Sequence, residues 1–427
     1  MSEKTSRIQG FYKLPLEERL KIVAEFAELT EDEKALLKKV GNLDLPIAER
    51  MIENVVGTMA YPFAIAVNFL INGKDKLIPM VIEEPSVVAA ASNAAKWARA
   101  KGGILTSSTG PIMIGQIQLT NVRDPWNVKL KILEHKSELV RIANEQDPTL
   151  VSLGGGVKDI EVRVIDTSRG PMVITHIIVD VRDAMGANAV NTMAEAIAPY
   201  IEDISGGRVL LRIISNLADK RLVRARTIID KNEIGGEDVV DRIVDAWAFA
   251  SSDPYRAATH NKGIMNGIIA VALATAQDHR AIEAGAHAYA SRSGKYSPLT
   301  VWEKNSEGDL VGSLEMPMAV GLVGGAVKTH PIARIALKIL GVKTADELGE
   351  IMGAVGLIQN LAALKALTTE GIQRGHMKLH ARNLAIMAGA TPDIVDLAVE
   401  KMIQEGKIRF DRAKEIVEEL KKMKSKV

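Results

Sequence analysis

The chain has 427 residues, of which 25% are charged, with a formal net charge of +1 and no cysteine. This length predicts about two or three domains with a large buried core. The near-neutral charge argues against nucleic-acid or membrane-surface binding, and the lack of cysteine excludes disulfides, thiolate-held zinc and cysteine nucleophiles. We therefore expect small molecules and copies of the same chain as partners.

The first 50 residues carry charged and apolar side chains at helical spacing, which predicts surface helices that form an arm. No signal-peptide core is found, and no stretch reaches the roughly 18 apolar residues of a membrane helix. The nearest candidate, residues 57–71, is interrupted by Pro62 and Asn68, so we expect a buried strand that ends in a turn at Asn72 and Gly73. These features predict a cytoplasmic protein.

Residues 85–101 form an alanine-rich helical pattern that stops at Gly102 and Gly103. Between residues 110 and 216, runs rich in β-branched side chains alternate with helical patterns near 127–145 and 188–203. The order strand, helix, strand, strand, helix, strand predicts a ferredoxin-like (split βαβ) sheet covered by helices on one face. We interpret residues 110–216 as a small domain inserted into a larger one.

The parts of the chain around this insertion, residues 1–109 and 217–374, are expected to fold together as a large mixed helical and strand domain. Residues 375–427 are expected to form a C-terminal flap with two amphipathic helices. The predicted fold class is therefore α+β. Because no Gly-x-Gly-x-x-Gly follows a strand and no Walker loop occurs, a Rossmann domain is not supported.

Two segments join predicted strands to predicted helices and carry polar groups. The first is DAMGAN at 183–188, where free amides at a helix start could cradle a pyrophosphate, although such turns are common in any α/β protein. The second contains Glu83 and Glu84. These carboxylates either cap a helix or, in their apolar setting, provide a proton donor with a raised pKa.

Lys262, in THNKG at 259–263, stands just before an apolar helical run. Such a lysine either extends its charge to solvent or is held by acids for chemistry, and Asp278 could supply the opposing charge. Further on, His376 and His380 are one helical turn apart. They lack the glutamate of a His-Glu-x-x-His zinc site, so we favour a mobile proton carrier beside Gly375, and we expect no metal.

Together these segments resemble class II 3-hydroxy-3-methylglutaryl-coenzyme A (HMG-CoA) reductase from about residue 10 to the C-terminus. The resemblance is carried by ENVVG at 53–57, EEPSVVAAAS at 83–92, DAMGAN at 183–188, THNKGIMNG at 259–267, GAHAYA at 285–290 and the segment around His376. It implies an oxidoreductase of the mevalonate pathway of isoprenoid metabolism. The implied reaction reduces HMG-CoA to mevalonate and coenzyme A with two nicotinamide hydrides.

The resemblance assigns the catalytic roles to Glu84, Lys262, Asp278 and His376. A buried Lys262 ammonium would stabilise charge on the carbonyl oxygen, and His376 would protonate the departing thiolate. Asp278 would keep Lys262 charged and link it to Glu84. Either Glu84 or Lys262 could deliver the final proton.

The resemblance also implies binding residues. Substrate contacts are expected at Ser86, Arg256 and Asn266, where Arg256 either binds the substrate carboxylate or makes an ordinary salt bridge. Cofactor contacts are expected at Asp147, Asp183, Met185, Gly186, Asn188 and Asn216. Because a carboxylate at Asp147 would accept from a ribose 2′-hydroxyl and repel a 2′-phosphate, NADH is expected over NADPH.

The implied assembly is a dimer with the active site at its interface, and such dimers commonly form larger assemblies such as hexamers. The flap would close His376 over the site and exclude water. Two rival functions are a binding module that keeps the fold without turnover and a coenzyme A thioester hydrolase or transferase. All four catalytic residue types are present, and no nucleophile that a hydrolase would need was found, so neither rival is favoured.

Overall fold

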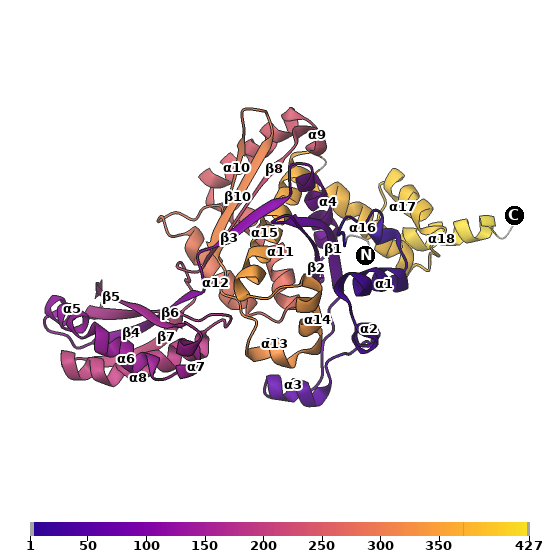
Figure 1. The fold of residues 1–427 in the computed structure, drawn as a ribbon. Helices are drawn as coiled ribbons and strands as arrows, with labels where there is room; N and C mark the ends of the chain where they lie inside the picture. Colours follow the sequence, from indigo (N-terminus) through magenta and orange to yellow (C-terminus); the bar gives the residue numbers. More distant parts are fainter. Residues whose placement is uncertain (1–3, 370, 425–427) are drawn as a thin grey trace.

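This computed structural model describes residues 4–369 and 371–424, without the side chains of residues 372–379 and 424. The fold is mixed α/β with two sheets. Figure 1 shows a large central unit, a smaller unit with its own sheet on one side, and a group of C-terminal helices on the other side.

The N-terminal part of the chain forms short helices on the outside of the large unit. They are η1 (Phe11–Lys13), α1 (Leu16–Ala27), α2 (Glu31–Lys38) and α3 (Leu45–Met51). Val23 of α1 packs in one apolar cluster with Ile335 and Ile339 of α14 (Pro331–Leu340). This cluster ties the N-terminal arm to a helix that comes much later in the sequence.

The large unit contains a six-stranded sheet with the order β2-β1-β3-β8-β10-β9. Its strands are β1 (Phe63–Ile71), β2 (Lys74–Val81), β3 (Ile104–Ser108), β8 (Leu222–Ile229), β9 (Thr300–Lys304) and β10 (Leu310–Pro317). The β1–β2 hairpin turns at Asn72 and Gly73, which have φ of 48° and 72°, as Asn-Gly hairpin turns require.

The buried strand expected over residues 57–71 is shorter than predicted. β1 begins only at Phe63, and residues 57–62 are exposed, so the first part of this prediction is wrong. The boundary has a simple cause, because Pro62 has no N–H to donate to a neighbouring strand.

The large unit also contains helices, most of which pack against this sheet. They are α4 (Val87–Arg99), α9 (Lys231–Ile234), α10 (Glu237–Ser252), α11 (Pro254–Ala274), α12 (His279–Ala290), α13 (Gly325–Thr329), α14 and α15 (Ala345–Thr368). α15 is the central helix and contacts α11, α4, β8 and β3.

By composition alone α15 could cross a membrane, since an 18-residue window has a mean hydropathy of 1.4. The expectation that no stretch is long and apolar enough is therefore wrong. However, 72% of that window is buried inside the protein, which is typical of a core helix.

The smaller unit has a four-stranded antiparallel sheet with the order β5-β6-β4-β7. Along the chain it consists of β4 (Ile112–Thr120), α5 (Pro125–Glu134), α6 (Lys136–Asn144), α7 (Pro148–Ser152), β5 (Gly156–Thr167), β6 (Gly170–Asp180), α8 (Ala187–Ser205) and β7 (Arg208–Ser215). Its apolar cluster, which includes Ile117, Ile132 and Ile197, is separate from that of the large unit. Figure 1 shows it projecting away from the large unit.

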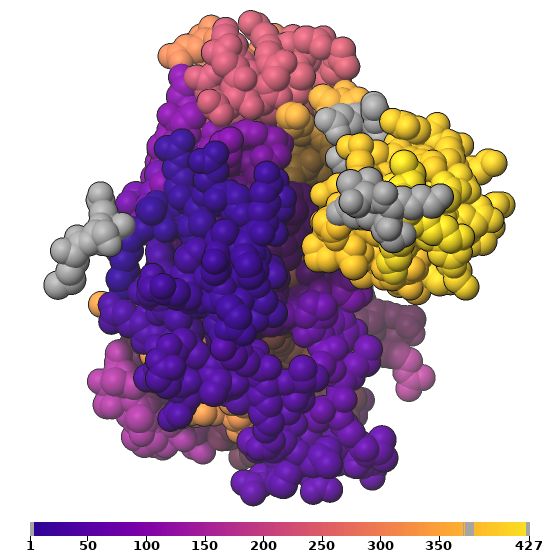
Figure 2. Space-filling model, turned by 90° about the vertical axis from the view of Figure 1, so that its right-hand side faces the viewer, coloured from indigo at the N-terminus to yellow at the C-terminus, as the bar shows by residue number. Residues whose placement is uncertain are grey.

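The C-terminal helices are α16 (Ile372–Met387), α17 (Val395–Gln404) and α18 (Phe410–Lys424). They share a small core of their own that includes Ala385, Val399 and Ile416. The chain therefore forms three helices here where two were expected, and α16 begins before Gly375, so this glycine lies within a helix. In Figure 2 these helices form a lobe beside the N-terminal residues.

Candidate active site

Two of the predicted catalytic residues meet in an ion pair. Lys262 Nζ lies 3.1 Å from Glu84 Oε2, and the two side chains are 61% and 34% exposed. Glu84 follows β2 in the turn that leads into α4, and Lys262 projects from α11. The expected burial of Lys262 is therefore wrong for the described part of a single chain, because no element in that part covers it.

The turn after Glu84 has an unusual backbone. Ser86 precedes α4 with φ 80°, a conformation that non-glycine residues rarely adopt, and its hydroxyl does not cap the helix. Its half-buried side chain is thus left for a ligand near Glu84.

The start of α11 explains why Lys262 faces outward. The Asp253 carboxylate accepts a hydrogen bond from the backbone N–H of Arg256, and Pro254 occupies the first helical position. His260 and Asn261 face the core, which turns Lys262 toward solvent. Asn266, one helical turn further, lies on the same side as Lys262 and is half-buried.

His260 is a buried residue that the sequence analysis did not single out. Its Nε2 lies 2.6 Å from Thr300 Oγ1, and this hydroxyl donates to Asn360 Oδ1 at 3.0 Å. Burial, with a smaller effect of the nearby Arg256 charge, lowers the pKa of His260 to about 3. His260 is therefore neutral at neutral pH and anchors α11 to β9 and α15. Its polar neighbours Thr259 and Asn261 gave no signal that separates such an anchor from a catalytic histidine.

Arg256 is half-buried, and burial lowers its pKa. Within the described part of the chain no carboxylate pairs with its guanidinium, so the ordinary salt bridge considered from the sequence is not formed there. A cation held at the start of α11 without a carboxylate partner suits an anionic ligand.

Asp278 does not meet Lys262 within one chain. Its carboxylate accepts from the backbone N–H of Ala281 at the start of α12 and pairs with Arg280 at 3.1 Å. The expected Asp278–Lys262 contact is absent from the described residues because α11 rises about 18 Å between Lys262 and Ala274, just before Asp278. The structure therefore separates these two predicted partners.

The predicted cofactor loop, residues 183–188, joins β6 to the start of α8. Gly186 has φ 101°, and a Cβ added there would lie 2.5 Å from Val181, so only glycine fits. The loop is held from both ends, because Asp183 Oδ1 accepts from the N–H of Ala345 at the start of α15 and the Met185 carbonyl accepts from Arg221. Asn188 stands in the first turn of α8.

The remaining cofactor candidates lie at the edges of the smaller unit. Asp147 begins α7, with Oδ1 accepting from the N–H of Leu150 at 2.9 Å. Asn216 follows β7, is exposed, and its carbonyl lies so close to α12 that a Cβ on Gly285 would meet it at 2.6 Å. His376 falls on α16, but its side chain lies outside the described residues.

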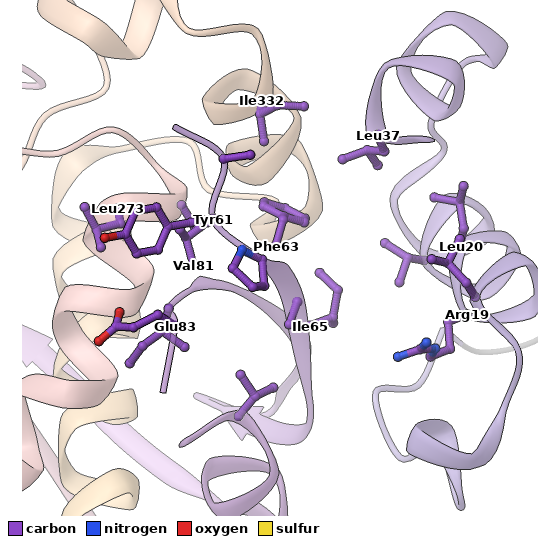
Figure 3. Close-up of a pocket in the computed structure, with 18 of the residues that line it drawn as sticks. Arg19, Leu20, Leu37, Tyr61, Phe63, Ile65, Val81, Glu83, Leu273 and Ile332 are labelled. Carbon is purple, nitrogen blue, oxygen red and sulfur yellow. The ribbon is translucent and has the colours of Figure 1, made fainter. Parts of the chain in front are cut away.

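A cavity of about 1930 Å³ opens beside Glu84, and the sequence analysis did not predict it. Figure 3 shows Tyr61, Glu83 and Leu273 on one wall and Arg19 and Leu20 on the opposite wall. Its lining includes the basic side chains Arg7, Lys13, Arg19, Lys38, Lys39 and Lys96 beside the acidic Glu17, Glu83 and Glu84. The charged residues of the first 50 positions were interpreted as part of surface helices that form an arm. The cavity was therefore missed, although basic residues among them line it.

Arg19 is the most informative residue of this lining. Its Nε is buried and has no hydrogen-bond partner within the described protein. A buried donor without a partner is costly, so an acceptor from a ligand would stabilise it. No group of three or more His, Asp or Glu side chains in the described ranges is arranged to hold a metal.

Comparisons with known proteins identify the family of this chain. The family described as Hydroxymethylglutaryl-coenzyme A reductase matches residues 15–381. A reductase of that name from Archaeoglobus fulgidus is 63% identical over 418 residues, covering 98% of this chain and 95% of the relative. A probable one from Borreliella burgdorferi is 35% identical and covers 83% of this chain and 82% of the relative.

Solved structures are similar over the whole fold. The reductase of Streptococcus pneumoniae has a TM-score of 0.83 at 41% identity, covering 96% of this chain and 99% of that one. A class II structure from the same organism, bound to NADPH in open conformations, has a TM-score of 0.81 at 41% identity, covering 96% and 100%. This chain belongs to the hydroxymethylglutaryl-coenzyme A reductase family, as its resemblance to the class II enzymes predicted.

Proposed function

We propose that this reductase interconverts HMG-CoA and mevalonate plus coenzyme A in a four-electron reaction, with NADH as the preferred reductant. In the reductive direction, HMG-CoA, two NADH and two protons give mevalonate, coenzyme A and two NAD⁺. The observation that carries the proposal is the Lys262–Glu84 pair, 3.1 Å apart at the edge of the large cavity.

Each step of this chemistry has a matching side chain. As the thioester carbonyl is reduced, charge develops on its oxygen, and the Lys262 ammonium stabilises it. Glu84, in contact with Lys262, is placed to hold or deliver the proton that the final alkoxide needs. The leaving thiolate, whose parent pKa is about 8.5, would be protonated by His376.

The residues of the smaller unit fit a nicotinamide dinucleotide, which would supply one hydride each time NADH is bound, so that two NADH bind in turn. The close approach at Gly186 and the free amides at the start of α8 form a cradle suited to a pyrophosphate. Asn188 and Asn216 are side chains that could orient the dinucleotide.

The Asp147 carboxylate supports NADH as the preferred form. It would accept from a free ribose 2′-hydroxyl and repel a 2′-phosphate. The related Streptococcus structure is bound to NADPH, so the preference is a property to be measured on this chain.

The large cavity is suited to the coenzyme A part of the substrate. Its lining combines apolar walls with basic side chains, which match the chain and the phosphates of coenzyme A. Arg19, with its unpartnered Nε, is the candidate phosphate contact. The hydroxymethylglutaryl end of the substrate would be bound by Arg256, Ser86 and Asn266.

We also propose that the active site forms between two copies of the chain. Lys262 is exposed and Glu84 partly so, Asp278 is about a helix length away, and no described part of the same chain brings them together. A second copy that presents its Asp278 and cofactor loop to this pair would complete the site, and such dimers could form larger assemblies. The helices after Gly371 would act as a flap that carries His376.

The test is the loss of nicotinamide absorbance when purified protein is mixed with HMG-CoA and either NADH or NADPH. We expect two NADH to be consumed per HMG-CoA, faster than NADPH, and no consumption by Lys262→Ala. If HMG-CoA binds but neither cofactor is consumed, the chain is a binding module and the proposed reaction is refuted.

A further inference from the structure

A backbone segment, residues 318–323, which is buried up to Gly321, lies between the cofactor loop and Asp278. On one side the backbone N–H groups of Leu322 and Val323 donate to the carbonyl of Asp183. Gly321 is so close to the loop that an added Cβ would lie 2.4 Å from the nitrogen of Met185. The segment and the loop are thus in direct backbone contact.

Arg221 stabilises the contact between the loop and the segment by hydrogen bonds to both of them. It is 3% exposed, and its guanidinium donates to three backbone carbonyls: Ala184 at 3.1 Å, Met185 at 3.3 Å and Val320 at 2.6 Å. Two of these carbonyls belong to the cofactor loop and one to the buried segment. The planar, forked geometry of a guanidinium lets one side chain bridge both.

Gln277 forms hydrogen bonds to the same segment on the side of Asp278. Its Nε2 donates to the Gly321 carbonyl at 2.9 Å, and its Oε1 accepts from the Gly321 N–H at 2.8 Å. Both bonds are buried, and Gln277 directly precedes Asp278. A displacement of Gly321 would therefore be transmitted to the residue beside Asp278.

We propose that Arg221 and Gln277 are positioning residues that fix the cofactor loop and Asp278 at a set separation, on opposite sides of this one segment. Neither side chain has to touch substrate or cofactor to do so. The inference rests on the proposed function, because it assigns the loop to the cofactor and Asp278 to the catalytic step.

The two residues should affect different kinetic constants. Arg221→Lys keeps the charge but cannot bridge three carbonyls, so the loop loosens and the KM for NADH rises roughly tenfold. Gln277→Met keeps the side-chain volume but loses both bonds to Gly321, so Asp278 shifts and kcat falls roughly tenfold with little change in the KM for NADH. The KM for HMG-CoA should change less than about twofold in both variants, since the substrate lies on the other half of the site.

Thr227→Val is the matched control. Thr227 is 3% exposed and donates one buried hydrogen bond to the Gly103 carbonyl at 2.9 Å, away from the loop and from Asp278. Its loss should lower the melting temperature and leave kcat and both KM values unchanged.

The experiment is steady-state kinetics of the full-length wild type and the three variants with NADH and HMG-CoA. The proposal is supported if Arg221→Lys raises mainly the KM for NADH and Gln277→Met lowers mainly kcat. It is overturned if either variant folds but does not show its expected change. If one variant does not fold, the other decides alone. An inactive wild type would instead refute the proposed function, so the two failures are distinguishable.

Discussion

The two halves of the candidate site are built in opposite ways. The Lys262–Glu84 half is open: the lysine is 61% exposed, and Glu84 lines a large cavity. The Asp278 side chain is itself 39% exposed, but the backbone behind it is braced by hydrogen bonds between buried atoms of Arg221, Gln277 and the segment 318–323.

This difference follows from what each half must do. A large, flexible thioester has to enter and leave the open half. The other half has to hold a cofactor and a carboxylate at a fixed separation, which buried hydrogen bonds can do. An exposed ion pair is screened by water, so Lys262 would gain its full electrostatic effect only when a partner and the ligands exclude solvent.

The largest effect is expected on the open half. Lys262→Ala should lower kcat for HMG-CoA reduction by about a thousandfold, because it removes the cation at the developing oxyanion. HMG-CoA binding, measured by calorimetry, should persist because the cavity and Arg256 are unchanged. A variant that keeps more than about a tenth of the activity would exclude Lys262 as the oxyanion stabiliser.

A smaller effect should appear at the edge of the cofactor half. Asp147→Ser keeps a side-chain acceptor for the N–H of Leu150, so α7 stays capped, but it removes the negative charge. The ratio of kcat/KM for NADPH to that for NADH should rise about tenfold, the scale of one relieved charge repulsion near the surface. An unchanged ratio would show that Asp147 does not face the ribose.

The smallest effect on activity is expected at His260, behind Lys262. Its pKa is about 3 in the folded chain, below its ordinary value, so the unfolded chain binds more protons in the acidic range. The free energy of unfolding should therefore fall as the pH drops from about 6.5, at up to about 1.4 kcal/mol per pH unit. His260→Gln retains an N–H donor for Thr300 and should reduce this slope in denaturant titrations at several pH values. Equal slopes in both proteins would refute the assignment.

Much of this site could be predicted because motifs mark local structure. The resemblance carried by the segments around Glu84 and Lys262 predicted catalytic roles for both residues, although not their direct contact, and the glycine in the turn before α8 stands out in the segment 183–188. Burial could not be predicted in this way. Whether Lys262 is covered depends on elements far away in the chain and, under the proposed dimer, on a second copy.

Other errors have particular causes. The expected contact between Asp278 and Lys262 is not formed within one chain, because the rise of α11 alone separates them by about 18 Å. The basic residues of the first 50 positions suggested a solvated arm, but packing against α14 turns several of them into a cavity wall. α15 was not recognised as the central helix because its polar ends mask an apolar middle.

The most direct test of a site shared between two copies is complementation by mixed dimers. Lys262→Ala and Asp278→Ala, each inactive alone, are unfolded together, refolded and assayed for NADH oxidation with HMG-CoA. If Lys262 of one copy acts with Asp278 of the other, about a quarter of wild-type activity should return, because half of the dimers are mixed and each has one intact site. If the mixture stays inactive while dimers form, both residues act within one chain, and the account of two half-sites is wrong.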